Sequence, residues 1–293
     1  IDGLIFVGLP LEYKGKLYNT AAVLHRGEIL GIVPKKYLPN YHEFYEVRHF
    51  TKGMEEPVEI ELAEGICVPM GTKLIFSCKD LPELKVAAEI CEDLWTPNPP
   101  SIGHALAGAT LLVNLSASDE ITGKDIYRKD LVAGQSARLV CGYVYASAGD
   151  GESTQDVVYS GHNLIGENGV VLAESQRFET GITYSEIDVM RLSSERRKMN
   201  TFEIEDEGYL EIPFSLNMEE TKLTRYIDPA PFVPSSKENR DKRCEEILAI
   251  QANGLKKRLE HTGCKSAVVG ISGGLDSTLA LLVTVKAFRS EEH

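Results

Sequence analysis

Basic side chains are scarce in this sequence of 293 residues. It has 31 Lys and Arg against 44 Asp and Glu, which gives a formal net charge of −13. Nucleic-acid-binding surfaces usually carry a basic excess, so we expect no nucleic-acid partner. No apolar run approaches the roughly 20 residues that cross a bilayer, and no basic-then-apolar leader opens the chain. We therefore expect no membrane partner.

Paired cysteines are also missing. The six cysteines form no CxxC pair and no dense framework, so we expect reduced thiols and a cytoplasmic location. The histidines show no metal-ligand spacing, and we predict no metal site built from protein ligands. What the sequence does contain is 43% hydrophobic and 26% charged residues, the balance of a globular protein that can bury a sizeable core.

Hydrophobic patterning predicts strands interleaved with helices. Apolar residues on both sides of Arg26-Gly27 predict a hairpin of strands 17–25 and 28–33. Apolar runs predict buried strands at 4–9, 85–90 and 110–115. Further short strands are expected at 65–68, 72–76, 143–148, 161–165, 170–173 and 181–189, with helices at 101–108 and 124–140. This alternation indicates a layered α/β architecture.

The composition changes after about residue 200. Residues 201–220 are acidic and weakly patterned, and three prolines follow between 227 and 236, which is typical of a linker. We expect a first domain at 1–215, a linker at 216–236 and a second domain at 237–293 that begins with a helix at 237–261. An apolar strand follows residue 3 directly, and the sequence stops soon after a phosphate-loop signature. We therefore expect a piece of a longer protein at both ends.

The second domain carries a glycine-rich loop between a predicted strand, 266–271, and an apolar helix, 279–288. Paired glycines let backbone N–H groups approach an anion, and the following helix directs its positive end to the same place. The loop resembles the SGGxDS loop of the N-type ATP pyrophosphatases. That resemblance implies that the pyrophosphate end of ATP, with Mg²⁺, is bound by Gly270, Ile271, Ser272, Gly273, Gly274, Leu275, Asp276 and Ser277.

Cys91 stands at the end of a predicted strand, where a nucleophile would be exposed and held rigidly. Its acidic neighbours Glu89, Glu92 and Asp93 disfavour a thiolate unless a cation lies nearby. Taken alone, the pattern therefore favours a buried structural cysteine over a reactive one.

Two other segments change this interpretation. The run KKYLPNYHEFYEVRHF at 35–50, the run EICED at 89–93 and the run NLSAS at 114–118 resemble, in this order, the nitrilase superfamily. They are more closely similar to the glutaminase domain of the glutamine-dependent NAD(+) synthetases. The resemblance implies Cys91 as nucleophile, Lys35 as the cation that supports thiolate and oxyanion, with Lys36 as its competitor, and Glu43 as a supporting acid. It places the base glutamate upstream of residue 4, outside this sequence.

For glutamine recognition the same resemblance implies Tyr41, Ser118 and Lys124. A free amino acid needs donors for its carboxylate and acceptors for its ammonium. The family often has Arg where Lys124 stands, and Lys makes a weaker, non-bidentate contact with a carboxylate. The alternative is a core tyrosine with a surface serine and lysine.

The resemblance implies a four-layer αββα sandwich, followed by the start of a parallel-sheet α/β nucleotide-binding domain. The implied activity joins ammonia from glutamine to ATP-activated deamido-NAD(+), in an enzyme expected to be a homo-oligomer. The rival hypotheses are a nitrilase-type amidase fused to an unrelated pyrophosphatase-like module and a chain that serves only as an interaction domain. Asparagine synthetase-like enzymes use an N-terminal cysteine, so the internal Cys91 argues against them.

Overall fold

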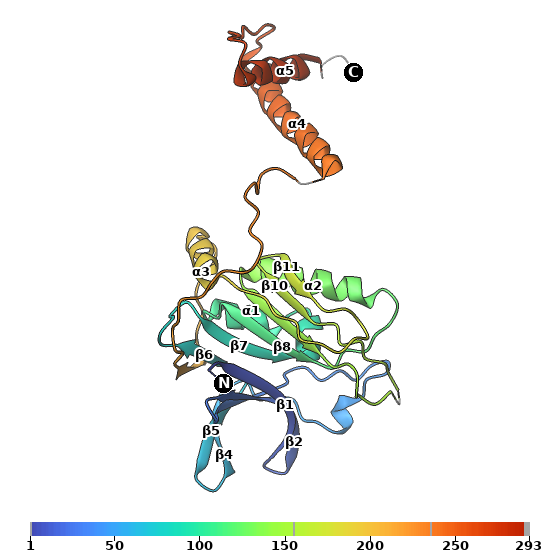
Figure 1. Ribbon diagram of the computed structural model, residues 1–293, viewed down its shortest axis with the longest axis vertical. Helices are drawn as coiled ribbons and strands as arrows, with labels where there is room; N and C mark the ends of the chain where they lie inside the picture. Colours follow the sequence, from blue (N-terminus) through green and yellow to red (C-terminus); the bar gives the residue numbers. More distant parts are fainter. Residues whose placement is uncertain (1, 155, 235, 290–293) are drawn as a thin grey trace. The chain divides into compact units, whose positions relative to one another are not determined.

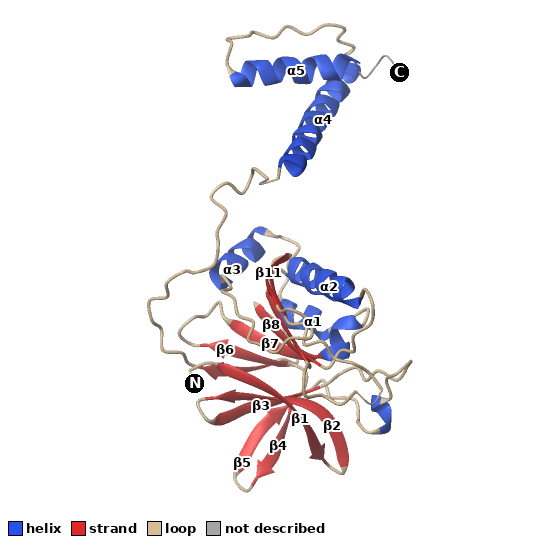
Figure 2. Ribbon diagram, turned by 45° about the vertical axis from the view of Figure 1, so that its right-hand side comes forward, coloured by secondary structure: helices blue, strands red, loops and turns tan. Residues whose placement is uncertain are grey.

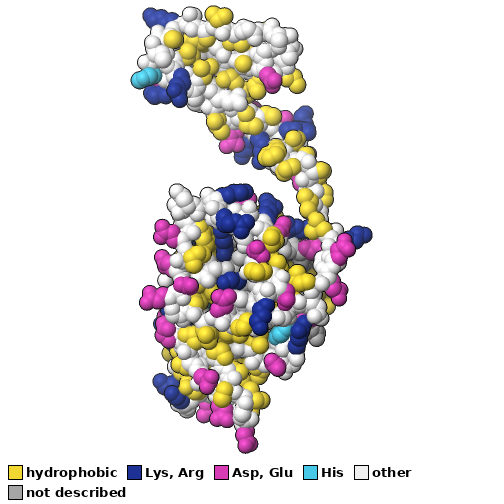
Figure 3. Space-filling view, turned by 90° about the vertical axis from the view of Figure 1, so that its left-hand side faces the viewer, with side chains coloured by type: hydrophobic (Ala, Val, Ile, Leu, Met, Phe, Trp, Pro, Cys, Tyr) yellow, Lys and Arg dark blue, Asp and Glu magenta, His cyan; other side chains and the backbone are white. Residues whose placement is uncertain are grey.

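The computed structural model describes residues 2–154, 156–234 and 236–289. The chain divides into two compact units, residues 1–225 and 226–293 (Figure 1), and each is described by itself. None of the helices in these described ranges is long and apolar enough to cross a membrane. Figure 3 shows charged side chains of both signs spread over one face of the first unit, with hydrophobic side chains between them.

A five-stranded sheet forms one layer of the first unit, in the order β1-β2-β3-β5-β4. The strands are β1 (Leu4–Tyr13), β2 (Lys16–His25), β3 (Glu28–Pro34), β4 (Val58–Ala63) and β5 (Ile66–Met70). The predicted β2–β3 hairpin is confirmed, and its turn residues Arg26 and Gly27 both have positive φ, 49° and 90°. That conformation matches the twist of a tight antiparallel hairpin.

A seven-stranded sheet forms the next layer, in the order β11-β10-β9-β8-β7-β6-β12. The strands are β6 (Leu74–Cys78), β7 (Lys85–Ile90), β8 (Leu111–Ser116), β9 (Gly142–Ser147), β10 (Leu164–Glu167), β11 (Val170–Glu174) and β12 (Leu210–Phe214). The central strands β7, β8 and β9 are parallel. Parallel strands covered on both faces read as continuous apolar runs, which is why β7 and β8 were predictable from the sequence.

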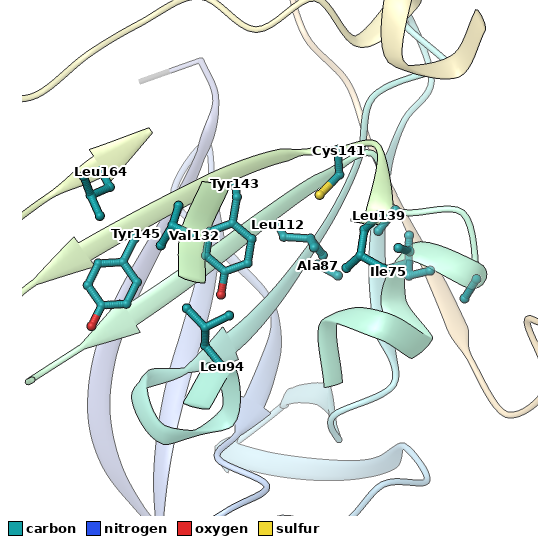
Figure 4. Close-up of a cluster of buried hydrophobic side chains, with 13 residues drawn as sticks. Ile75, Ala87, Leu94, Leu112, Val132, Leu139, Cys141, Tyr143, Tyr145 and Leu164 are labelled. Carbon is teal, nitrogen blue, oxygen red and sulfur yellow. The ribbon is translucent and has the colours of Figure 1, made fainter. Parts of the chain in front are cut away.

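Helices cover the outer face of the seven-stranded sheet (Figure 2). They are α1 (Pro100–Leu106), α2 (Lys124–Leu139) and α3 (Val189–Lys198). Side chains of α1 and α2 pack on β7, β8 and β9 in a core that includes Ala87, Leu112, Val132 and Tyr143 (Figure 4). The inner face packs on the five-stranded sheet. The paired sheets of the predicted sandwich are thus confirmed, and three of its four layers lie in the described part of the chain.

Three sequence predictions in the first unit need correction. Residues 181–188 are irregular where a strand was predicted, because Ile182 and Tyr184 are 92% and 82% exposed and face no sheet. The Asp188 side chain then accepts a hydrogen bond from Arg191 N and starts α3. Strand β10 begins at Leu164 rather than at residue 161. Strands β4 and β12 were not predicted, and β12 falls in the acidic segment that showed weak patterning.

The second unit contains α4 (Lys237–Thr262) and α5 (Leu275–Arg289). Ser236 Oγ caps α4 by accepting from Asn239 N at 3.1 Å, and Gly263, at φ +67°, ends it. The strand predicted at 266–271 is not formed in the described residues. A strand needs partners for its backbone groups, and Val268 is fully exposed with no strand of the described second unit beside it. Helix α5 begins at Leu275, four residues earlier than predicted.

Candidate active site

Cys91 lies where β7 ends and a short 3₁₀ helix, η2 (Cys91–Trp95), begins. Its φ is +47°, in the left-handed region that non-glycine residues rarely occupy. The backbone is held there by a hydrogen bond from Cys91 N to Asn114 Oδ1 at 3.0 Å, from the end of the neighbouring strand β8. The thiol is only partly buried. The fold therefore presents Cys91 on a strained turn at the edge of the parallel strands, as expected for a nucleophile.

A polar layer lies directly beneath this turn. Asn114 Nδ2 donates to Tyr143 Oη at 3.2 Å, and that hydroxyl donates in turn to Glu89. The Glu89 carboxylate also accepts from Ser101 N at 2.8 Å. Full burial raises the pKa of Glu89 to about 7, against the lowering effect of the Tyr143 hydrogen bond. The Cys91 turn is thus supported by a chain of hydrogen bonds that ends at the buried Glu89.

Lys35 follows β3 directly and is 1% exposed. Its Nζ contacts Glu46 Oε1 at 2.6 Å, and Gly53 N and Asn19 O bind its backbone. Lys36 instead pairs with Glu55 at 3.2 Å nearer the surface, which favours Lys35 over Lys36 as the active lysine. A buried ammonium with an acidic partner is a fixed positive charge in a site of low polarity.

The acidic partner of Lys35 was not foreseen from the sequence. Glu43, the predicted supporting acid, is exposed and makes no ion pair with Lys35 in the described residues. The acidic partner of Lys35 is Glu46, which stands three residues after Glu43, at the start of the 3₁₀ helix η1 (Glu46–Arg48). Its second oxygen, Oε2, is buried without a hydrogen-bond partner among the described residues. Nothing in the run of acidic and aromatic residues distinguishes Glu46 from Glu43 before the loop is folded.

Asp93 brings the lysine segment and the cysteine turn together. Its carboxylate accepts from Ile90 N at 2.9 Å, just before Cys91, and from Tyr37 N at 2.8 Å, two residues after Lys35. Burial raises the pKa of Asp93 to about 6, against the lowering effect of these amides and of Lys35. One buried side chain thus joins the two segments that carry the candidate catalytic residues Lys35 and Cys91.

The predicted glutamine-binding residues lie around the same end of the sheet. Tyr41 Oη donates to Glu92 Oε1 at 2.6 Å, and partial burial together with this bond raises the pKa of Tyr41. Lys124 Nζ pairs closely with Asp119 and lies 5.3 Å from the centre of the Trp95 ring. A cavity of about 580 Å³ opens beside them, and its lining includes the acidic Glu43, Asp119, Glu120 and Asp156.

Arg128, which is fully buried, donates hydrogen bonds to Ser118 and Asp119. Its guanidinium donates to Glu120 Oε2 at 3.0 Å, to His162 Nδ1 at 2.9 Å and to Asp119 O at 3.3 Å. Because Arg can only donate, His162 accepts at Nδ1 and carries its proton on Nε2. This buried support was missed because an arginine on a helix normally predicts an exposed residue.

The glycine-rich loop of the second unit has the features of an anion site. Gly273 has φ +85°, and no atom lies within 4 Å of a Cβ built on Gly270 or Gly273. Ser272 N donates to Ser277 Oγ at 3.3 Å, which shapes the loop, and α5 begins directly behind it. The first amides of a helix have no partner within the helix and bind anions. The residues therefore fit a phosphate group, although no cluster of three or more metal-binding side chains occurs in the described ranges.

Two protein families match separate parts of the chain. The sequence model of the carbon–nitrogen hydrolase family matches residues 2–197, and that of the NAD synthase family matches residues 247–293. The glutamine-dependent NAD(+) synthetase of Mycobacterium tuberculosis (strain ATCC 25618 / H37Rv) is 43% identical over 299 residues, which cover 98% of this chain. The chain spans 44% of the length of that relative.

Two solved structures are similar as well. The glutamine-dependent NAD(+) synthetase from Cytophaga hutchinsonii matches with a TM-score of 0.54 and 30% identity, covering 62% of this chain and 29% of that one. The carbon–nitrogen hydrolase from Helicobacter pylori G27 matches with a TM-score of 0.52 and 21% identity, covering 67% of this chain and 65% of that one. The second likeness concerns the fold alone.

Proposed function

The chain belongs to the carbon–nitrogen hydrolase family, and we propose that it forms the glutaminase part, and the first segment of the synthetase part, of a glutamine-dependent NAD(+) synthetase. We propose domain bounds of 1–215 and 237–293 with a linker at 216–236. The observation that carries the proposal is the joint placement of a buried Lys35 and a strained Cys91, linked through Asp93. A homo-oligomeric assembly and a cytoplasmic location stay predictions.

The proposed first reaction is the hydrolysis of the glutamine side-chain amide. Cys91 Sγ attacks the amide carbon and forms a γ-glutamyl thioester, and the amide nitrogen leaves as ammonia after taking up the thiol proton. Water then cleaves the thioester and releases glutamate. Lys35 supplies a fixed positive charge for the oxyanion that forms in each step. We assign Glu46 the supporting role beside Lys35 and keep Glu43, which lines the cavity, as a predicted supporting residue.

Glutamine recognition is proposed to use the surroundings of the 580 Å³ cavity. Lys124 would bind the α-carboxylate, because its ammonium offers three donors and Asp119 occupies only part of them. The acidic lining suits the α-ammonium. Tyr41 and Ser118 complete the predicted set. Tyr41, tied to Glu92, would position that carboxylate next to the nucleophile.

The second proposed reaction uses the ammonia. ATP, as substrate, transfers AMP to the nicotinate carboxylate of deamido-NAD(+) with release of pyrophosphate, and ammonia then displaces AMP to give NAD(+). Residues Gly270–Ser277 would hold the pyrophosphate end through the loop and the first amides of α5. Mg²⁺, bound with the nucleotide, would neutralise part of the phosphate charge.

The test is NAD(+) formation by the full-length protein and by its Cys91→Ala variant, with ATP, Mg²⁺ and deamido-NAD(+). Each is supplied with glutamine or with a high concentration of ammonium salt. We expect Cys91→Ala to lose the glutamine-driven reaction and to keep the ammonia-driven one. Cys67→Ala, which removes an exposed thiol on β5, is the control and should keep both.

Two results would contradict the proposal. Full glutamine-driven activity in Cys91→Ala would show that Cys91 is not the nucleophile. A preference of the unmodified protein for short aliphatic amides over glutamine would favour an amidase joined to an unrelated ATP-using module.

A further inference from the structure

The Asp93 side chain accepts hydrogen bonds from backbone amides of both candidate catalytic segments. Its Oδ2 accepts from Ile90 N at 2.9 Å and from Lys36 N at 3.4 Å, and its Oδ1 accepts from Tyr37 N at 2.8 Å. The side chain is 1% exposed. Both carboxylate oxygens therefore accept hydrogen bonds from backbone amides, and the side chain is shielded from solvent.

A carboxylate is the only side-chain group of this size that can accept hydrogen bonds on both of its terminal atoms. Burying it is costly unless it is well hydrogen-bonded, and the amides on both sides of the site provide those bonds. An asparagine would place an NH₂ group where one oxygen stands, opposite an N–H that also donates. It could keep the bond to Ile90 or the bond to Tyr37 but not both with good geometry.

Within the described ranges, no hydrogen bond joins the backbone of one segment directly to the backbone of the other. Strand β3, which leads to Lys35, belongs to the five-stranded sheet, and β7, which leads to Cys91, belongs to the seven-stranded sheet. Side chains packed between two sheets can change rotamer, so packing alone leaves the distance between the sheets variable. Hydrogen bonds, in contrast, hold individual pairs of atoms at a defined distance. Asp93 is thus the side chain that ties the backbone next to Lys35 to the backbone next to Cys91, while the Tyr41–Glu92 bond joins the same segments further from both residues.

We propose that Asp93 is a positioning residue that fixes the ammonium of Lys35 against the thiol of Cys91. This inference rests on the proposed function, because it assigns the two residues their catalytic roles. It predicts that loss of the bridge lowers the rate of the chemical step while glutamine binding, which uses other side chains, is retained.

The test compares Asp93→Asn with Glu167→Gln in the full-length protein. Glu167 is a similarly buried carboxylate that accepts from Asp188 N and pairs with Arg225. It lies at the opposite end of the strands, because it pairs in register with Gly142 at the start of β9. Both variants remove a buried charge, so thermal unfolding of the two reports the structural cost alone.

Three quantities are measured in each variant. They are kcat and KM for glutamine-driven synthesis, the ammonia-driven rate, and the rate of alkylation of Cys91 by iodoacetamide, read on the Cys91 peptide by mass spectrometry. For Asp93→Asn we expect a fall in kcat of about 10²-fold, the usual effect of a misplacement near 1 Å. KM and the ammonia-driven rate should change little, and alkylation should slow. Glu167→Gln should keep all three.

Alkylation needs no glutamine, so it separates the two proposals. If the unmodified protein uses no glutamine, the proposed function fails, while slower alkylation in Asp93→Asn still supports the positioning role. Unchanged kcat and unchanged alkylation in Asp93→Asn would overturn the inference, as would a rise in KM alone. Asp93→Ser, which keeps one acceptor, provides a second variant. If neither variant folds, Asp93 is a structural requirement and the positioning role is refuted.

Discussion

Replacement of Arg128 by Met tests the buried hydrogen bonds that support Ser118 and Asp119. Methionine fills most of the space of the arginine stem, so the variant chiefly loses the guanidinium. That group is fully buried and bonds Glu120, His162 and the carbonyl of Asp119. Its loss leaves the Glu120 carboxylate, 4% exposed, with the more distant Arg177 at 3.5 Å as its ion-pair partner.

The expected loss follows from that unpaired charge. Removal of one partner of a buried ion pair usually destabilises by about 3–5 kcal/mol. Arg177 and a short hydrogen bond from Ser160 still reach Glu120, so we expect the lower end, about 3 kcal/mol. The double variant Arg128→Met/Glu120→Gln removes the stranded charge and should lose less than the sum of the two single changes.

Urea unfolding followed by the fluorescence of Trp95 measures this loss, because Trp95 is the single tryptophan of the sequence and lies in the first unit. Arg138→Met, at an exposed position of the same helix, is the control and should stay within about 0.5 kcal/mol of the unmodified protein. A loss below about 1 kcal/mol for Arg128→Met would refute the reasoning, since an exposed ion pair alone gives that much.

Four further predictions test other positions of the first unit. Gly53→Ala should destabilise by about 1–3 kcal/mol and lower glutamine-driven activity, because its Cβ would stand 2.8 Å from Lys35 O. Gly134→Ala on α2, with open space at its Cβ, should stabilise by about 0.5–1 kcal/mol in the same unfolding assay. A Gly134→Ala variant that is less stable than Gly53→Ala would contradict both expectations. Glu89 has a pKa raised from 4.5 to about 7, so its contribution to stability is present at acid pH and is lost as pH rises through 7. Unfolding at several pH values should show this fall, and Glu89→Gln should flatten it. Glu46→Gln should lower glutamine-driven kcat by about tenfold, the kinetic equivalent of one weakened charge-assisted bond to Lys35, and unchanged kcat would exclude Glu46 from the site.

Much of the fold was predictable because its central strands are covered on both faces. The continuous apolar runs of β7 and β8 and the turn at Arg26-Gly27 leave clear patterns in the sequence. Strand β12 left none, because it pairs at the edge of the sheet with β6, far away in sequence. The segment 181–188 shows the converse, in which apolar residues alternate but no neighbouring strand is there to pair with them.

The site was predictable to a lesser degree. The motif around Cys91 and the choice of Lys35 over Lys36 follow from the resemblance and stay predictions, and Lys35 is buried in the structure. The roles of Glu46 and Arg128 depend on which charges the fold brings together. Those contacts join residues 11 and 34 positions apart, as in Lys35–Glu46 and Arg128–His162. No local periodicity encodes such a pairing.

The left-handed backbone of Cys91 has a consequence for how far this fold can be stabilised. A non-glycine residue at such an angle costs on the order of 1–3 kcal/mol, and glycine adopts it freely. Glycine, which has no thiol, is therefore the residue with the least backbone strain at position 91. A search for more stable variants that screened only for heat resistance would therefore tend to replace Cys91, the proposed nucleophile, so such a search has to select for turnover at the same time.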